Sequence, residues 1–378
     1  MPDFGKLTEY LESLNEKYGV PVCDMIVYHK HQPVYRHMCG YSDAEKTIPV
    51  SSRDMYWIYS ATKVITCTAV MQLIEQGKIG LYDDVDKYLP EFANMNVADN
   101  GTIRPAKRKI RIFDLLTMQS GLTYNLNTDE IKRVLSETGN KASTREIVRA
   151  IAAGPLAFDP SERWMYSLSH DVLAAVVEVA SGKRFSTYLK DSIFDPLGMS
   201  DITFRMSEEQ RARLSAQYRY DFNSKEFVLT NGENMFVVSD EYESGGAGIA
   251  CTVDAYGIFV DAMCNNGVGA NGARILSGES IEQLRTNWLS GQSLEDFKKG
   301  GKAGYGYGLG VRTLIDKSKS RGPLKEFGWD GAACAYVLID PDNNLGIFMA
   351  MHTLMFVTAY FEIHPTVRDL TYEALGLG

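Results

Sequence analysis

The segment that decides the fold spans residues 60–77 and reads SATKVITCTAVMQLIEQG. Its apolar side chains recur at helical spacing from Val64 to Ile74, and Gly77 is a residue type that commonly ends a helix. Between its single lysine and its single glutamate the segment carries no charge, so the predicted helix should be buried on most of its faces. The rest of the chain must supply the layers that cover this helix.

Strand-like segments lie toward both ends of the chain, and helical segments lie between them. Apolar runs at 22–28 and 33–39 are separated by turn-like residues and predict a hairpin. Three further strands are predicted before a closing C-terminal helix, at 308–315, 335–340 and 346–351. Helices are predicted in the middle of the chain, at 114–118, 144–153 and 170–181.

This order of elements predicts an α/β fold of the α+β type. One antiparallel sheet is built from both termini and flanked by helices, and a mainly helical insertion lies between its two parts. We expect a single domain over residues 1–378. Its sheet-containing part should comprise about 1–85 and 228–378, and its mainly helical part about 86–227.

Composition and charge exclude several classes of protein. The chain has 378 residues, of which 45% are hydrophobic and 23% are charged, and these values rule out collagen, coiled coil and wholesale disorder. The net charge of −9 disfavours a nucleic-acid-binding protein, which needs a basic footprint. The same charge argues against binding to an anionic membrane surface. A small-molecule partner is therefore expected, with neither nucleic acid nor membrane.

The terminus and the cysteines bear on location. Residues 1–7 lack the basic-then-apolar pattern of a signal peptide, and the uncharged run 343–361 is interpreted as a strand followed by a helix. The six cysteines are far apart and form no Cys-x-x-Cys pair. We therefore expect a cytoplasmic protein with buried free thiols, with neither a disulfide framework nor a zinc site.

Ser60-Ala61-Thr62-Lys63 is the only Ser-x-x-Lys in the chain. Ser60 lies where strand-like sequence becomes a buried helix, and Lys63 follows just under one helical turn later, so its amine is expected over the serine oxygen. A lysine desolvated on an apolar helix binds its proton less tightly and can act as a base. An N-cap serine beside a snorkelling lysine is the other interpretation, and the spacing alone favours it.

Two later segments add chemistry-bearing residues. Tyr166 ends a proline-containing turn just before an apolar helix, although one tyrosine among 21 is normally a packing residue. Residues 327–333 form a glycine-rich stretch that is interpreted as a strand whose backbone could approach a ligand closely.

Taken in order, these segments resemble the serine β-lactamase and penicillin-binding-protein superfamily. The resemblance covers most of the chain and is to the class C-like branch, which includes family VIII carboxylesterases, DD-peptidases and acyltransferases. The matching motifs are Gly40-Tyr41-Ser42-Asp43 with Pro49, Ser60-Ala61-Thr62-Lys63, residues 112–122, Trp164-x-Tyr166-Ser167, Phe194-Asp195-Pro196-Leu197-Gly198-Met199, Gly245-Gly246-Ala247-Gly248-Ile249 with Asp254-Ala255-Tyr256, Gly306-Tyr307-Gly308-Leu309-Gly310, Trp329-Asp330-Gly331 and Asp340-Pro341.

The resemblance implies an acyl-enzyme mechanism without cofactor or metal. Ser60 would attack a carbonyl carbon, and Lys63 and Tyr166 would share the roles of base and acid. The backbone amides of Ser60 and Ala332 would form the oxyanion hole. His170 is a rival base, although a helical histidine is usually a packed or solvated residue.

Departures from the family pattern bear on the substrate. The family's Tyr-x-Asn is Tyr166-Ser167-Leu168 here, so Leu168 replaces the amide that orients an acylamino group. Its Lys-Thr-Gly is Trp329-Asp330-Gly331, and Asp330, if it faces the pocket, would repel an anion. Together with the absent export signal, these changes favour neutral esters over β-lactams. The further candidates for the pocket wall are Tyr124 and Met235-Phe236, each of which fits ordinary core packing equally well.

A carboxylesterase acting on small to medium acyl esters is therefore the expected function. The alternatives are a D-amino-acid peptidase or amidase, a weak class C-like β-lactamase, and an acyltransferase that uses the same intermediate. A non-catalytic penicillin-binding-type protein is disfavoured because Ser60, Lys63 and Tyr166 are all present.

Overall fold

The protein is described by a computed structural model over residues 2–99 and 101–377. Its main sheet consists of Val22–His29 (β1), Gln32–Gly40 (β2), Tyr305–Tyr307 (β10), Arg312–Leu314 (β11), Phe327–Gly328 (β12), Tyr336–Asp340 (β13) and Leu345–Ala350 (β14). The strand order is β10-β11-β12-β13-β14-β1-β2, and every neighbouring pair is antiparallel. The predicted antiparallel sheet built from both ends of the chain is confirmed.

The other strands are short and lie outside this sheet. They are Tyr56–Trp57 (β3), Asn96–Asp99 (β4), Thr102–Pro105 (β5), Ile202–Thr203 (β6), Tyr218–Asp221 (β7), Glu226–Leu229 (β8), Ala250–Cys251 (β9) and Thr353–Leu354 (β15). They form sheets of two or three strands, in the orders β15-β7-β8, β3-β9-β6 and β4-β5.

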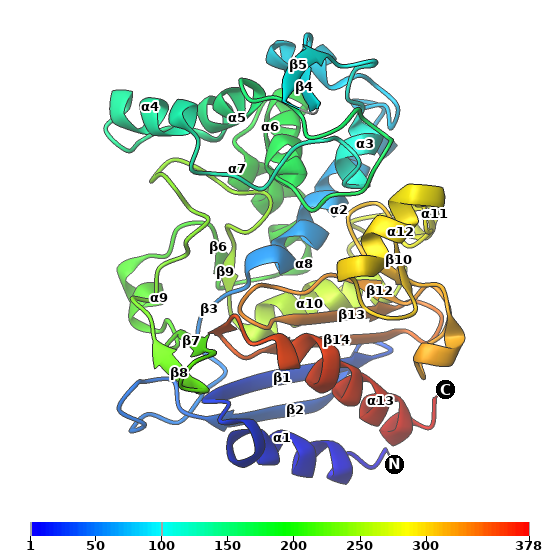
Figure 1. The fold of residues 1–378 in the computed structure, drawn as a ribbon. Coiled ribbons are helices and arrows are strands. Elements are labelled where there is room, and N and C mark those ends of the chain that lie inside the picture. The colour runs from blue at the N-terminus through cyan, green and yellow to red at the C-terminus, as the bar shows by residue number, and fades with distance from the viewer. Residues whose placement is uncertain (1, 100, 378) are drawn as a thin grey trace.

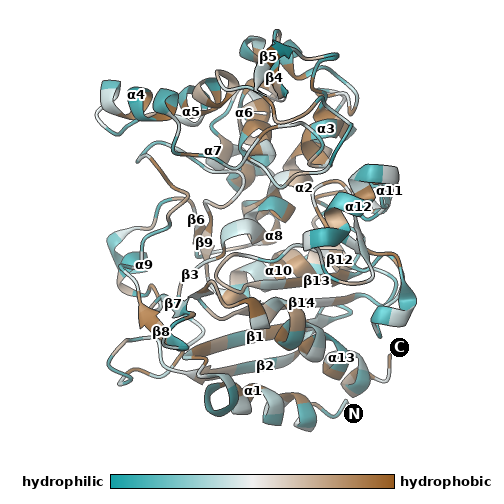
Figure 2. Cartoon of the chain, in the orientation of Figure 1, coloured by the Kyte–Doolittle hydropathy of each residue, from teal (hydrophilic) through white to brown (hydrophobic). Residues whose placement is uncertain are grey.

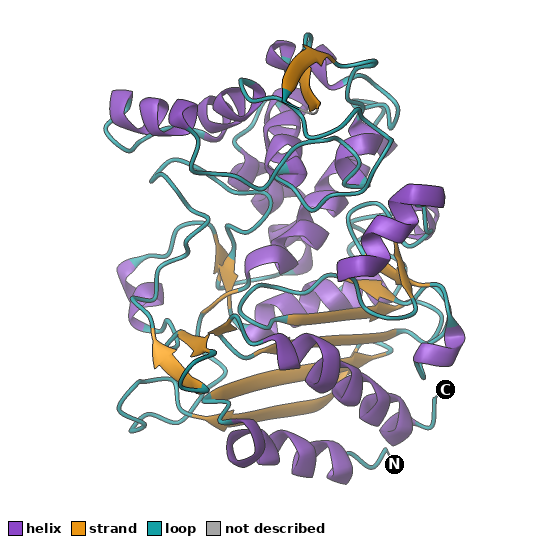
Figure 3. Ribbon diagram, in the orientation of Figure 1, coloured by secondary structure: helices purple, strands orange, loops and turns teal. Residues whose placement is uncertain are grey.

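The α-helices are Gly5–Tyr18 (α1), Thr62–Glu75 (α2), Ile112–Leu116 (α3), Asp129–Glu137 (α4), Thr144–Ala152 (α5), Ser169–Ser181 (α6), Phe185–Leu189 (α7), Asp195–Leu197 (α8), Glu208–Ala212 (α9), Val253–Cys264 (α10), Gly278–Leu284 (α11), Gly291–Gly300 (α12) and His364–Leu375 (α13). Figure 3 shows that the longer strands gather in one half of the molecule, while helices dominate the half that holds α3 to α7.

Both faces of the main sheet are covered, and this explains why β1 is almost wholly apolar. In Figure 1, α1 and α13 lie in front of the sheet and α10 lies behind it. Met25 and Val27 pack on the α1 and α13 side, whereas Val22 and Ile26 belong to the cluster that contains α10. The alternation follows from the two-residue period of a strand.

The buried helix predicted from residue 60 is α2, and it connects the two halves. All of its residues from Thr62 to Leu73 are buried, it packs mainly on α6, and Gly77 follows it in the left-handed conformation, with φ +68°. Figure 2 shows hydrophobic residues along α6, whereas α4 and α9 at the periphery are more hydrophilic. Among the described residues, no helix combines the length and hydropathy that a bilayer crossing requires.

Two of the predicted strands are wrong in their extent. Of the strand expected at 308–315, only β11 is a strand; residues 308–311 form the turn that joins it to β10, and Gly310 in this turn has a φ of +84°. A Cβ atom on Gly308 would lie 2.0 Å from the carbonyl oxygen of Leu284, so this glycine also marks a close backbone approach. The strand expected over 327–333 is confined to β12, and turn and loop residues follow it.

Candidate active site

Ser60 lies at a sharp corner between β3 and α2. A 3₁₀ turn, Tyr59–Ala61, joins the two elements, and Tyr59 has a φ of +47°, which is rare for an aromatic residue. Gln217 donates a hydrogen bond to the Tyr59 hydroxyl at 2.7 Å, and His352 Nε2 accepts the backbone N–H of Trp57 at 3.2 Å. These contacts hold the strained corner, which places the Ser60 side chain at the edge of a pocket.

Lys63 lies on the first turn of α2 and is fully buried. Its Nζ donates to Ser60 Oγ at 3.1 Å and to the carbonyl oxygen of Gly246 at 2.7 Å. Within the described part of the chain it makes no ion pair. The expected approach of the Lys63 amine to the Ser60 oxygen is therefore present, and a snorkelling lysine is excluded because the amine is not at the surface.

Tyr166 reaches the same serine from the loop before α6. Its hydroxyl donates to Ser60 Oγ at 2.7 Å. The Tyr166 ring stacks between Tyr124, at 5.2 Å between ring centroids, and Trp329, at 5.6 Å. Lys63 Nζ lies 4.7 Å from the centre of the Tyr166 ring. Ser60 Oγ thus receives hydrogen bonds from an amine and a phenol, which is the arrangement that serine activation requires.

Asp171, which the sequence did not single out, holds the loop that receives Lys63. Its Oδ1 accepts hydrogen bonds from Tyr242 at 2.5 Å, Ser244 at 2.6 Å and the amide of Gly246 at 3.4 Å. A Cβ atom on Gly246 would lie 2.7 Å from Asp171 Oδ2, so glycine is needed for this approach. A carboxylate within an apolar helix was the available signal.

The residues after β12 pack tightly against the nucleophile corner. A Cβ atom on Gly331 would lie 2.1 Å from the carbonyl oxygen of Ile58, so the glycine-rich backbone approaches this corner rather than a ligand. Tyr360 donates to the carbonyl oxygen of Gly331 at 2.9 Å. Because the peptide bond is trans, the amide of Ala332 points the opposite way. Within the described chain, that amide has no hydrogen-bond partner.

His170, the rival base, is not at the site. It is fully buried on α6, and its Nε2 lies 3.2 Å from the Sγ of Cys67. Burial, reinforced by the charge of Lys63, holds the pKa of His170 well below its ordinary value. It therefore remains neutral beneath the site, without a hydrogen bond to Ser60.

A pocket of about 340 Å³ opens beside Ser60. The residues that line it are Ser60, Tyr166, Phe297, Gly300, Gly301, Lys302, Arg312, Trp329, Asp330, Gly331, Ala332, Val357, Tyr360 and Phe361. Sequence reasoning named six of them: Ser60, Tyr166, Trp329, Asp330, Gly331 and Ala332. It missed Lys302, Arg312 and the apolar wall because no local pattern distinguishes them from the other charged and apolar residues of the chain.

The expectation that Asp330 repels anions is wrong. Its carboxylate is 2.5 Å from Lys302 Nζ and 2.9 Å from Arg312 Nη1, so it is already neutralised by two cations. Burial would raise the pKa of Asp330, but Arg312 and Lys302 more than offset this and hold it far below its usual range. The pocket therefore presents two cations for one anion.

Two further expectations about the pocket wall are corrected. Leu168 is only 2% exposed and belongs to the hydrophobic core, so it is not a substrate contact. Met235 is 67% exposed, whereas Phe236 packs edge-on against Tyr59 and Tyr124. Tyr124 stacks on Tyr166, lies near Lys63 and interacts with the Ser60 side chain, although it does not line the pocket.

Side chains that could bind a metal ion, and the thiols, are the remaining candidates for chemistry. Over residues 2–99 and 101–377, no group of three or more His, Cys, Asp or Glu side chains is arranged to hold a metal ion. The six cysteines are free thiols, five of them buried. Burial raises the pKa of Cys67, which lies on α2 itself, so this thiol stays protonated at neutral pH.

Comparisons with known proteins identify the family and several similar chains. A family model described as Beta-lactamase matches residues 7–367. Protein Rv1367c of Mycobacterium tuberculosis H37Rv is 28% identical over 365 residues, which cover 89% of this chain and 90% of that protein. Lovastatin esterase of Penicillium rubens is 28% identical over 319 residues, which cover 79% of each chain.

A solved structure shows the same fold. EstCE1, described as a hydrolase with promiscuous acyltransferase activity, superposes with a TM-score of 0.79 at 21% sequence identity, over 98% of both chains.

Proposed function

Since the chain belongs to the Beta-lactamase family, we propose that it is a serine hydrolase that acts through an acyl-enzyme, most specifically a carboxylesterase on small to medium acyl esters. One observation carries the proposal: Ser60 Oγ, at the edge of a largely apolar pocket, accepts hydrogen bonds from both Lys63 Nζ and Tyr166 Oη. A structural serine at a helix start needs neither donor.

In the acylation step, Ser60 Oγ attacks the ester carbonyl carbon. Lys63 and Tyr166, which we treat as one coupled group, enter this step with one proton removed from the pair, and the pair takes the hydroxyl proton. The negative charge that develops on the carbonyl oxygen is stabilised by the backbone amides of Ser60 and Ala332. The tetrahedral intermediate then expels the alcohol, which takes the proton, and Ser60 remains as an ester of the acyl group.

In the deacylation step, water attacks the acyl-Ser60 carbonyl carbon and gives a proton to the same pair. Collapse of the second tetrahedral intermediate releases the carboxylic acid and returns the proton to Ser60 Oγ. Tyr166 is positioned for both steps because Trp329 Nε1 donates to its hydroxyl at 3.3 Å. Stacking between Tyr124 and Trp329 fixes the plane of its ring.

The preference for esters over β-lactams rests on the residue at position 168. Leu168 is buried in the core, so no amide at this position can orient the acylamino group of a penicillin or cephalosporin. Trp329 and Tyr124 flank Tyr166, and we propose that Trp329 forms one wall of the acyl site. The names of the relatives, such as lovastatin esterase, support ester chemistry as well.

The test is turnover of p-nitrophenyl butyrate and of a chromogenic cephalosporin by the wild type and by Ser60→Ala. We expect ester hydrolysis that falls by at least about 1,000-fold in Ser60→Ala, with slow cephalosporin cleavage. Equal thermal melting of the two proteins would show that the fold is retained. Ester hydrolysis that survives in Ser60→Ala would contradict the nucleophile, and efficient cephalosporin cleavage would favour the β-lactamase alternative.

Acyl transfer to an alcohol is a second candidate function, and the exposed apolar residues of the pocket favour it. Val357 and Phe361 line the pocket, and about half of each residue is exposed, 49% and 58% respectively. Such apolar surface can hold an alcohol where water would otherwise attack the acyl-enzyme. Adding 2-phenylethanol to the butyrate assay should then yield phenylethyl butyrate at the expense of butyric acid. Release of butyric acid alone would exclude this candidate.

A further inference from the structure

We propose that the pocket beside Ser60 selects substrates that carry a carboxylate, and that Lys302 is the residue that binds it. The inference rests on the proposed acyl-enzyme function and names the class of substrate. It departs from the preference for neutral esters that the sequence suggested, because one ground for that preference was an unpaired Asp330.

The first argument is the balance of charge on the pocket wall. Lys302, Arg312 and Asp330 line the same pocket as Ser60, and they contribute two positive charges and one negative charge. Arg312 is held in the wall by its neighbours, since Nη1 donates to Asp330 and Nη2 donates to the carbonyl oxygen of Val337 at 2.7 Å, and its side chain is only 3% exposed. The excess positive charge is therefore available at Lys302.

The second argument is a spare hydrogen-bond donor. An ammonium group has three N–H donors. Two of them face Asp330 Oδ2 at 2.5 Å and His364 Nδ1 at 3.5 Å. No other hydrogen bond of Lys302 Nζ is present among residues 2–99 and 101–377. The Lys302 side chain is 15% exposed, so the third donor can meet a ligand in the pocket without a change in the fold.

The groups behind the cluster do not cancel this charge. Burial, and then the charge of Lys302, lower the pKa of His364 to about 4, so this imidazole is neutral at pH 7. Glu326 lies behind Arg312, outside the pocket lining, where it accepts the hydroxyl of Tyr305. Arg368 donates to the same hydroxyl at 3.1 Å and also pairs with Asp369 at 2.8 Å. Burial raises the pKa of Glu326, which weakens its negative charge.

The third argument is the apolar surroundings, which strengthen any charge contact. Phe297, Trp329, Val357 and Phe361 line the same pocket as the charged residues. A carboxylate that binds Lys302 in such surroundings gains more from its charge-assisted hydrogen bond than it would at an open surface. The same apolar wall accommodates the chain that connects the carboxylate to the ester.

The ionisation of Lys302 gives this selectivity a pH dependence. Burial lowers the pKa of Lys302 to about 8, although Asp330 opposes the shift. A lysine loses its charge above its pKa, so the preference for carboxylates should disappear as the pH rises from 7 to 9. The charged and titratable groups that face it are Asp330, Arg312, Glu326, His364 and Tyr336.

The kinetic test compares two esters of equal length and shape. One is the mono-p-nitrophenyl ester of glutaric acid, and the other is its neutral terminal amide. We expect a higher kcat/KM for the carboxylate, by about 10-fold or more, and a loss of this preference in Lys302→Met. Lys302→Arg should restore part of it, since the charge is retained. A preference unchanged in Lys302→Met would overturn the proposal.

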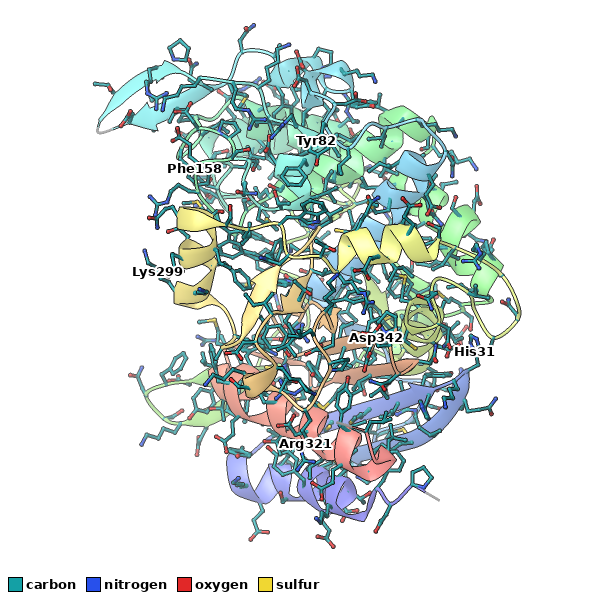
Figure 4. The ribbon with its side chains drawn as sticks, turned by 90° about the vertical axis from the view of Figure 1, so that its right-hand side faces the viewer. His31, Tyr82, Phe158, Lys299, Arg321 and Asp342 are labelled. Carbon is teal, nitrogen blue, oxygen red and sulfur yellow. The ribbon has the colours of Figure 1, made fainter. Side chains whose placement is uncertain are left out.

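The matched control is Lys299→Met. Lys299 lies near the end of α12, three residues before Lys302, and its side chain is 71% exposed; it is labelled in Figure 4. It carries the same charge but does not line the pocket. We expect the preference to be unchanged in this variant. An equal loss in Lys299→Met and Lys302→Met would mean that the overall field of the protein, and not Lys302, attracts the carboxylate.

A binding measurement separates this proposal from the proposed function. Titration calorimetry would compare 4-phenylbutanoate with 4-phenylbutanamide on the wild type at pH 7 and pH 9, and on both Lys302 variants. Tighter binding of the carboxylate that depends on Lys302 supports the subsite even if no ester is hydrolysed. Ser60-dependent turnover of neutral esters, without any carboxylate preference in rate or binding, would refute the subsite and leave the esterase function intact.

Discussion

Two largely buried lysines lie at the site, one behind Ser60 and one in the pocket wall, and their surroundings differ. Lys63 shares a single helical turn with Ser60, and its contacts are a hydroxyl and a backbone carbonyl, with no carboxylate within ion-pair distance among the described residues. Lys302 follows α12. Its amine lies 2.5 Å from the carboxylate of Asp330, which comes shortly after β12, and 3.5 Å from Nδ1 of His364 at the start of α13. The first lysine is placed by local sequence, and the second is placed only by the folded chain.

The different surroundings of the two lysines predict that Lys63 supports the reaction rate and that the Lys302 cluster supports stability. Removal of Lys63 leaves no buried carboxylate without a partner, so its loss should appear in the reaction rate. The Lys302 cluster contains a buried ion network, so disruption of its acid should appear in stability. The predictions below test this division, from the largest expected effect to the smallest.

Lys63→Met should lower kcat/KM for p-nitrophenyl butyrate by up to about 10,000-fold, because a positioned proton-transfer group is lost. The melting temperature should change little, since a methionine fills the same buried space. Steady-state kinetics and thermal unfolding of the same preparation check both statements. A normal acylation rate in Lys63→Met would show that Tyr166 alone activates Ser60.

Asp330→Asn should destabilise the protein by about 3–5 kcal/mol, because Lys302 and Arg312 would remain buried without their shared counter-charge. Urea unfolding at pH 7 measures this change. The control is Asp342→Asn, which breaks a surface pair with Arg285 and should cost about 1 kcal/mol or less. Asp342 is labelled in Figure 4. Similar losses in both variants would contradict the structural role of Asp330.

Gly331→Ala should lower the acylation rate by about 100- to 1,000-fold, the usual effect of losing one oxyanion donor. The new Cβ atom would lie 2.1 Å from the Ile58 carbonyl oxygen, so the segment must shift and move the Ala332 amide. Gly278→Ala is the control, because its nearest neighbour would lie at 3.7 Å. Pre-steady-state acylation separates this effect from changes in substrate binding.

Acidic pH should lower the free energy of unfolding through two buried histidines. Burial lowers the pKa of His352, behind the nucleophile corner, and of His364, beside Lys302, to about 4 in each case. A group whose pKa is lower in the folded state binds its proton mainly after unfolding. Stability is therefore complete above about pH 6.5 and falls as the pH drops toward 4, by about 3 kcal/mol per histidine.

His352→Gln keeps an acceptor for the Trp57 amide and removes one titration, so its unfolding free energy should fall about 3 kcal/mol less than that of the wild type between pH 7 and pH 4. His364→Gln should show the same reduction at the Lys302 side. Urea unfolding at several pH values measures both. Parallel curves for the wild type and a variant would mean that its histidine does not titrate in this range.

Much of the fold followed from the pattern of apolar residues. The hairpin β1–β2, the buried helix α2 and the antiparallel sheet were all predicted, because period-2 and period-3.6 patterns respond to burial. The strand expected at 308–315 failed for a physical reason: glycines alternate with apolar residues there, and the pattern cannot show that Gly310 adopts a left-handed conformation. Such a turn depends on the packing of Gly308 against Leu284.

The residues of the site also differ in whether the sequence could predict them. Ser60 and Lys63 could be paired from their spacing, and Tyr166 from a resemblance, because each lies in a recognisable segment. Lys302, one of 39 lysines and arginines, carries no such mark. Asp330 was named, but its influence was misjudged because its partners come from β11 and from the end of α12. Ion pairing across distant segments is invisible until the chain is folded.

The pairing of β1 with β14 also determines when, during synthesis, the central sheet can form. Asp24 pairs with Ala350, so about 300 residues of chain are synthesised between the two strands of the central pairing. At about 5–20 residues per second, the N-terminal hairpin waits on the order of 15–60 s for its neighbour. Throughout that interval β1 has an open edge, and its face toward α10 stays uncovered until residues 253–264 have been made. We therefore expect chaperones to bind the nascent chain. Its first forty residues are the region most exposed to misassembly.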